Sequence, residues 1–151
     1  MTPPLLDVAG VSRTYAMGGL FTRHRTRAVD SVSFRLEASR PEIFAIVGES
    51  GSGKTTLARM ILNTIAPSAG TIRFQGTDLA RIRRGRDRLA FMRQVQPIFQ
   101  NPFEAFNPLK HVDRYLFVTA QRMACLGTPE AVAQRADEAL KQVGLSLAEV
   151  R

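Results

Sequence analysis

The sequence has little that would mark it as a secreted or membrane-spanning protein. Its 151 residues include one cysteine, Cys125, which excludes an internal disulfide framework and favours a reducing compartment. That cysteine is interpreted as a small apolar residue. No apolar run approaches the ~20 residues that a membrane-spanning helix requires. Residues 1–4 do not resemble a signal peptide. With 44% hydrophobic residues, the chain can bury the core of one ordinary domain.

The chain also has few acidic residues relative to basic ones, and its net charge is +8. Two arginine clusters, at 23–27 and 81–88, supply much of this excess. Such clusters can attract nucleic acid or an anionic membrane surface. No aromatic residue is interleaved with the arginines as a platform for stacked bases, however. Solvated loops are therefore the favoured interpretation, and nucleic-acid binding ranks last.

The first half of the chain changes its hydrophobic period. Alternating patterns at 5–11 and 32–36 predict half-buried strands. The continuous apolar run Ile43–Val47 predicts a strand buried on both faces of an α/β sheet. Helical spacing then follows from Leu57 to Ile65, and Pro67 is expected to end that helix.

The second half gives weaker signals. Short strands are predicted at 72–74 and 95–99, with an arginine-rich stretch between them that could be helical but is interrupted by Gly85. Thr128 as N-cap, followed by Pro129, predicts a last helix that Gly144 ends. Its expected apolar face consists of Val132, Ala136, Leu140 and Val143. We find no internal repeat and no break in composition that would mark a second domain.

One motif carries chemistry: the segment 48–55 matches G-x-x-x-x-G-K-[ST] at every fixed position. Glycines let the backbone curl so that its N–H groups face one anion. The helix that follows adds roughly +0.5 of an elementary charge at its N-terminus. The lysine would contact the β- and γ-phosphates of ATP, and the threonine hydroxyl would bind Mg²⁺. The matching residues are Gly48, Glu49, Ser50, Gly51, Ser52, Gly53, Lys54 and Thr55.

Beyond this loop, the sequence resembles the ATP-binding subunits of ATP-binding-cassette (ABC) transporters. The resemblance rests on GESGSGKTTL at 48–57, PSAGTI at 67–72, and QPIFQNP at 96–102 followed by FNP at 106–108. The last stretch is similar to the oligopeptide, dipeptide and nickel importer subfamily, as is AVDSVSF at 28–34.

The resemblance implies an α/β fold: an incomplete P-loop NTPase (RecA-like) core with an N-terminal antiparallel β subdomain and the start of a helical subdomain. One nucleotide-binding domain would then divide into a β region at 1–41, the P-loop core at 42–100, and the Q-loop with the first helical residues at 101–151.

The resemblance also implies site roles. The loop Gly48–Thr55, with Thr56, would hold MgATP. Gln100 matches the Q-loop glutamine, which touches the Mg²⁺ shell and couples to the membrane subunit. Tyr15 matches the aromatic residue that stacks on adenine. Phe103 and Phe106 are expected to pack or to contact a subunit.

Departures from the family pattern limit what these residues can do. Asn101 stands where the family usually has Asp, and Arg40-Pro41-Glu42 replaces a usual glycine before the glutamate. The sequence contains no L-S-G-G-Q signature, Walker B strand or switch histidine. His24 and His111 lie in the wrong parts of the chain for that switch, and no aspartate ends an apolar strand, neither Asp30, Asp78, Asp87 nor Asp113.

Hydrolysis requires carboxylates that hold Mg²⁺ and polarise water, so we expect these residues to bind ATP without turnover. We also expect the run Ile43–Val47 to lack neighbouring strands and the isolated chain to be marginally stable.

The function that the sequence predicts is the ATP-binding subunit of an importer of peptides or similar small solutes. Its partners would be transmembrane permease subunits and a second ATP-binding subunit. The location would be peripheral, at the cytoplasmic face of the membrane. Two alternatives remain open: a non-hydrolysing regulatory module or remnant, and a small P-loop phosphotransferase whose lid would carry the arginines of 81–88.

Overall fold

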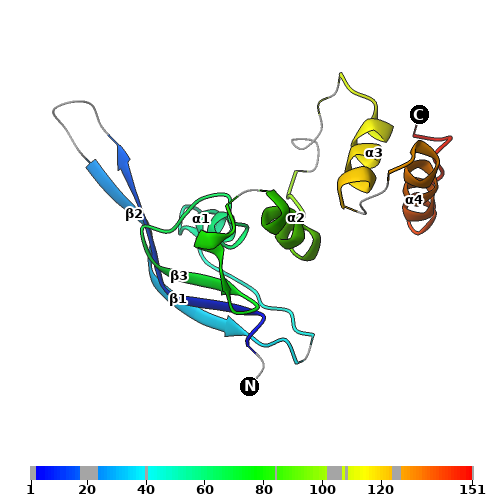
Figure 1. The fold of residues 1–151 in the computed structure, drawn as a ribbon. Coiled ribbons are helices and arrows are strands. Elements are labelled where there is room, and N and C mark those ends of the chain that lie inside the picture. The colour runs from blue at the N-terminus through cyan, green and yellow to red at the C-terminus, as the bar shows by residue number, and fades with distance from the viewer. Residues whose placement is uncertain are drawn as a thin grey trace. The chain divides into compact units, whose positions relative to one another are not determined.

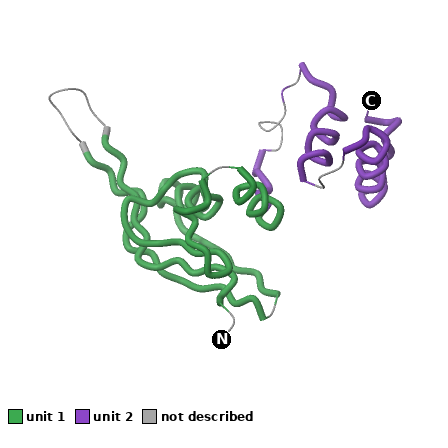
Figure 2. Tube along the Cα trace, viewed as in Figure 1, with its two compact units in different colours: residues 1–95 green, residues 96–151 purple. Residues whose placement is uncertain are grey.

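A computed structural model describes residues 3–17, 24–39, 41–83, 85–101, 107, 109–123 and 127–150. The chain divides into two compact units, Met1–Val95 and Gln96–Arg151 (Figure 2), and each unit is considered by itself. The predictions made for Arg40, Phe103, Phe106 and Cys125 fall outside the described residues.

The first unit is built on a four-stranded antiparallel sheet in the order β2-β1-β3-β4 (Figure 1). The alternation in the sequence is confirmed, because Leu6 and Val8 are buried whereas Asp7 between them lies on the other face and pairs with Arg35 at 2.9 Å. Side chains of one strand alternate between the two faces of a sheet, so one apolar face is available for packing. The strands are β1 (Leu6–Met17), β2 (His24–Leu36), β3 (Ala69–Phe74) and β4 (Thr77–Asp78).

Helix α1 (Lys54–Ile61) covers the apolar face of this sheet with Leu57 and Met60. The 3₁₀ turn η1 (Leu79–Arg81) and helix α2 (Gly85–Gln94) complete the layer. The Phe91 ring of α2 meets Phe74 edge-on, with ring centroids 5.4 Å apart. The buried core of unit 1 consists of Leu6, Val8, Val11, Val29, Leu57, Met60, Ile72, Leu79, Ile82 and Phe91.

The predicted buried strand at 43–47 and the predicted short strand at 95–99 are wrong for this structure. Both segments lack strand structure, and Ile43 is 100% and Ile98 99% exposed. An apolar strand is buried only when neighbouring strands and helices cover it, and no described segment pairs with either run. Phe44 stacks on Phe34 of β2 with ring centroids 4.7 Å apart, and Val95 packs half-buried against the core of unit 1.

Several predicted boundaries shift. Helix α1 ends at Ile61, before Pro67, because the chain turns at Asn63, which has a positive φ of 53°. The Asn63 amide donates to the carbonyls of Leu79 and Ile82, at 3.1 and 2.7 Å, which fixes that turn against η1. Gly85 begins helix α2 instead of interrupting it.

The described residues of the second unit form the helices α3 (Val112–Met123) and α4 (Pro129–Lys141). The predicted start of α4 is confirmed: Thr128 Oγ1 accepts from the Ala131 N–H at 3.3 Å, and Pro129 follows. Gly144 also lies at the end, with φ 77°, but Val143 is 72% exposed and is not part of the apolar face. Val143 lies beyond the last helical residue, so the helical period no longer sets its direction.

Asp137 ties the end of α4 together. Its carboxylate accepts from Lys141 Nζ at 2.7 Å and from the Leu147 N–H at 3.0 Å. These contacts, the lysine first, hold the pKa of Asp137 below its ordinary value. The small stabilisation they give is present at neutral pH and is lost as the pH falls through that lowered pKa.

Within the described residues, no helix is long and apolar enough to cross a bilayer.

We predict that Met60→Ala destabilises unit 1 strongly, because Met60 is 1% exposed and its removal leaves a cavity between α1 and the sheet. The expected loss is about 2–5 kcal/mol in the free energy of unfolding, measured by urea denaturation. Met92→Ala is the matched control, since Met92 is 38% exposed. Equal losses in the two variants would contradict the assigned core.

Candidate functional site

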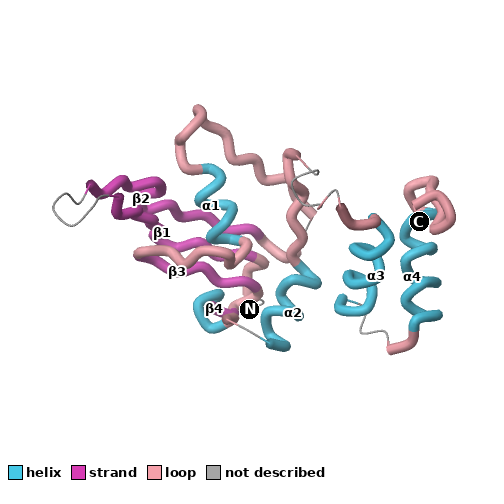
Figure 3. Tube along the Cα trace, turned by 90° about the horizontal axis from the view of Figure 1, so that it is seen from above, coloured by secondary structure: helices cyan, strands magenta, loops and turns pink. Residues whose placement is uncertain are grey.

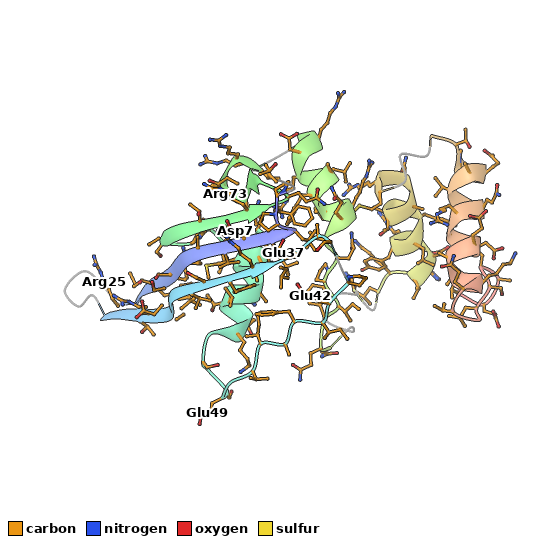
Figure 4. All side chains as sticks on the ribbon, turned by 90° about the horizontal axis from the view of Figure 1, so that it is seen from below. Asp7, Arg25, Glu37, Glu42, Glu49 and Arg73 are labelled. Atoms are coloured by element: carbon orange, nitrogen blue, oxygen red, sulfur yellow. The ribbon has the colours of Figure 1, made fainter. Side chains whose placement is uncertain are left out.

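The loop that joins β2 to α1 is exposed and ends in a tight turn at the start of the helix (Figure 3). The Ser52 N–H donates to the Glu49 carbonyl at 3.2 Å, and Gly51 and Gly53 adopt φ values of 82° and 92°. Glycine adopts these left-handed conformations without steric cost. The side chain of Glu49 lies at the tip of the loop and points away from the sheet (Figure 4).

Lys54 organises this turn from inside. Its ammonium Nζ donates to the carbonyl oxygens of Gly48 and Glu49, at 2.7 and 2.6 Å, and to Ser52 Oγ at 3.3 Å. The loop therefore curls around a positive charge, which lies at the N-terminus of helix α1. No side chain caps the first turn of α1 and no acidic residue lies in it, so its N–H groups and partial positive charge can face an anion.

Gly53 is fixed by a close approach to β2. A Cβ atom at Gly53 would overlap the carbonyl oxygen of Ala28 and approach Val29 Cγ2 to 3.3 Å. Ala28 is the extra residue of a β-bulge, because Arg13 pairs with Val29 and the next residue, Thr14, pairs with Arg27. A bulge leaves one residue outside the ladder, and here the carbonyl of that residue faces the start of α1.

Tyr15 lies on β1, opposite the part of β2 that contacts Gly53. It pairs with Thr26, two residues from Ala28 on β2, a separation of about 7 Å along a strand. The guanidinium of Arg13 lies over the Tyr15 ring, with its central carbon 4.8 Å from the ring centroid. Tyr15 thus lies on the strand that pairs with β2, two positions along β2 from the residue that Gly53 approaches.

The other candidate residues lie on the first turn of α1 or in the second unit. Thr55 is exposed and Thr56 half-buried on the first turn of α1. Gln100 and Asn101 lie at an exposed bend of unit 2, whereas the loop belongs to unit 1. In the described ranges, no group of three or more His, Cys, Asp or Glu side chains could hold a metal ion.

Two residues at this corner were not singled out by the sequence. The contact of Ala28 depends on a bulge, which no local pattern announces. Arg13 precedes the candidate tyrosine by two residues and so shares its face of the strand. That spacing was the available signal.

A glycine-rich turn that closes around a lysine and opens a helix on a β-sheet is typical of a P-loop nucleotide-binding protein. The sequence pattern of the ABC transporter family matches residues 29–151, and the chain belongs to this family. Similar curated proteins include the nickel import ATP-binding protein NikE of Shigella boydii serotype 4 (strain Sb227), 40% identical, and that of Escherichia coli (strain K12), 39% identical. Each match covers 142 residues, 93% of this chain and 52% of the relative. The chain therefore spans about half the length of these relatives.

Solved structures agree on the fold. A dimeric ATP-binding cassette in a post-hydrolysis state, bound to ADP and phosphate, superposes with a TM-score of 0.72 at 22% identity, over 96% of this chain and 60% of that one. The cbiO1 protein of Clostridium perfringens, part of the ABC transporter complex cbiONQ, gives a TM-score of 0.65 at 25% identity, over 94% and 51%. The predicted α/β P-loop fold class is confirmed.

We predict that Gly53→Ala destabilises unit 1 more than Gly51→Ala does. Both substitutions place a side chain at a left-handed φ, which costs about 1 kcal/mol, but only the Cβ at position 53 meets β2. Urea midpoints of the two variants measure the difference. Equal midpoints would contradict the contact between Gly53 and Ala28.

Proposed function

We propose that the chain is the N-terminal part of one nucleotide-binding domain of an ABC importer, with a β region at 1–41, a P-loop core at 42–100 and the Q-loop with the first helical residues at 101–151. The observation that carries this proposal is the turn around Lys54, whose ammonium lies among loop carbonyls at the uncapped start of α1. The family match and the fold support it.

Each residue of the loop has a role in this proposal. Lys54 exchanges its two carbonyl partners for the β- and γ-phosphates of ATP, and the N–H groups of 51–56 bind the phosphate oxygens. Mg²⁺ would arrive with the nucleotide and would be held by the Thr55 hydroxyl. The family resemblance predicts Gln100 as a further ligand. The loop fits a phosphate because it encloses the ammonium of Lys54. Thr55 is exposed, so its hydroxyl is accessible to a metal ion.

Adenine stacks on Tyr15 in this proposal. A planar aromatic ring near the P-loop provides base–aromatic stacking, worth about 1–3 kcal/mol per base. The pairing of Tyr15 with Thr26, two residues from the bulged Ala28 that contacts Gly53, supports this position.

These 151 residues bind MgATP and do not hydrolyse it. Water attack on the γ-phosphate needs a carboxylate that orients the water and another that holds Mg²⁺. The sequence offers no apolar strand that ends in such a pair. The lack of these two carboxylates also favours the alternative, a nucleotide-binding module that regulates without hydrolysis.

The complete subunit would work with others. We propose permease subunits as membrane partners, a second ATP-binding subunit that closes over the nucleotide, and a peripheral position at the cytoplasmic face of the membrane. The imported solute would be a nickel species or a peptide: nickel is named for the relatives, and the Gln96–Asn101 stretch resembles the wider peptide and nickel subfamily. The match over 29–151 includes that stretch and favours transport over a phosphotransferase.

The experiment that tests nucleotide binding compares the chain with Lys54→Ala. Loss of the ammonium should weaken MgATP binding at least tenfold in isothermal titration calorimetry, about 1.4 kcal/mol or more. Arg73→Ala, an exposed cation on β3 (Figure 4), is the control and should leave affinity unchanged. Equal affinity in the Lys54→Ala variant and the unaltered chain would refute the proposed site.

Steady-state phosphate release tests the absence of turnover. We expect the same rate in the chain and in Lys54→Ala, since neither has the carboxylates that hydrolysis needs. A rate that exceeds the Lys54→Ala background would contradict the proposal and identify a water-activating group elsewhere in the chain.

A further inference from the structure

Outside the loop 48–55, Arg13 makes a specific contact with the ring of Tyr15. Arg13 and Tyr15 are two residues apart on β1, so their side chains leave the same face of the strand. The central guanidinium carbon of Arg13 lies 4.8 Å from the centroid of the Tyr15 ring. This is the distance of a cation–π contact.

The arginine is held in that position from its other side. Its Nη1 donates to the carbonyl oxygen of Ala66 at 2.8 Å, in the segment between α1 and β3. Its Nε is buried and has no hydrogen-bond partner. Burying an N–H group without an acceptor is unfavourable, so the Ala66 bond and the stack on the ring must offset that cost. Thr14, the residue between them, is held as well, because its N–H donates to Ser68 Oγ at 3.1 Å.

We propose that Arg13 is the positioning residue of the adenine platform. It covers one face of the Tyr15 ring, which restricts an incoming base to the opposite face, and it fixes the plane of the ring before the base arrives. The inference rests on the proposed role of Tyr15 and names the residue through which that role is exerted. It accounts for the buried Nε, which the P-loop chemistry does not use.

The benefit of such a contact is preorganisation. An unrestrained tyrosine must lose rotamer freedom when a base stacks on it, and a ring that is already held loses less. Arg13 therefore strengthens the binding of ligands that carry a base and has no effect on the phosphates. This separation distinguishes positioning from simple charge attraction.

Two ligands separate these effects. ATP carries base, ribose and phosphates, whereas inorganic tripolyphosphate carries the phosphates alone. We measure the affinity of the 151-residue chain for both, each with Mg²⁺. Arg13→Leu should weaken ATP binding about fivefold, the size of a partly exposed cation–π contact, and should leave tripolyphosphate binding unchanged. Arg13→Lys should restore part of the loss, because an ammonium also lies favourably over a ring.

Arg25→Leu is the matched control. Arg25 pairs with Ala16, the neighbour of Tyr15, and it is exposed near the start of β2 (Figure 4). This variant removes the same charge at nearly the same place without removing the ring contact. We expect it to leave the ratio of ATP to tripolyphosphate affinity unchanged.

The outcomes are distinct. If Arg13→Leu weakens both ligands equally, Arg13 acts through its charge or through the fold, and the inference is overturned. If Tyr15→Leu lowers ATP affinity about tenfold but Arg13→Leu does not change it, the proposed role of Tyr15 stands and that of Arg13 fails. If Tyr15→Leu leaves ATP affinity unchanged, both fail. A selective loss of ATP binding in Tyr15→Leu and Arg13→Leu, with a double variant no weaker than Tyr15→Leu, supports the inference.

Discussion

At the start of helix α1, the backbone of Gly53 comes so close to the carbonyl of Ala28 that no side chain fits between them. Three features of unit 1 lie around this approach. Helix α1 begins at Lys54 directly after this contact, its Leu57 and Met60 are buried, and Thr26, the partner of Tyr15, lies two residues from Ala28 on β2. The bulge on β2 makes the approach possible, because it turns one carbonyl out of the ladder.

Local chemistry made much of the fold predictable. The alternation in β1 and β2 and the N-cap at Thr128 each depend on neighbouring residues, and each is confirmed. The run Ile43–Val47 shows the limit. Its apolar composition is typical of a buried strand, but burial also requires neighbouring strands and helices, which the run itself does not predict. The sequence did not predict helix α3, because the residues around 112–123 lack a clear N-cap and a glycine that would end the helix.

The candidate site divides in the same way. The loop Gly48–Thr55 could be located because its residue types and spacing are required by phosphate chemistry. Ala28 could not be located, since its part in the site depends on the register of β1 with β2, whereas the spacing of Arg13 from Tyr15 was a signal that the sequence offered. That register shifts at bulges between Val11 and Arg13 and again before Thr14. A one-residue change in register would redirect every later side chain.

The contacts of Lys54 give the loop a property of its own. In the free protein the ammonium already has three oxygen partners within the loop, two of them backbone carbonyls at 2.6 and 2.7 Å. In the proposed function a phosphate would have to replace these partners, so the loop carbonyls would compete with the phosphate for the ammonium of Lys54. Measured affinity is then the difference between two sets of contacts. If the proposed function holds, substitutions that weaken the contacts of Lys54 within the loop would tighten nucleotide binding, even where the altered residue does not contact the nucleotide.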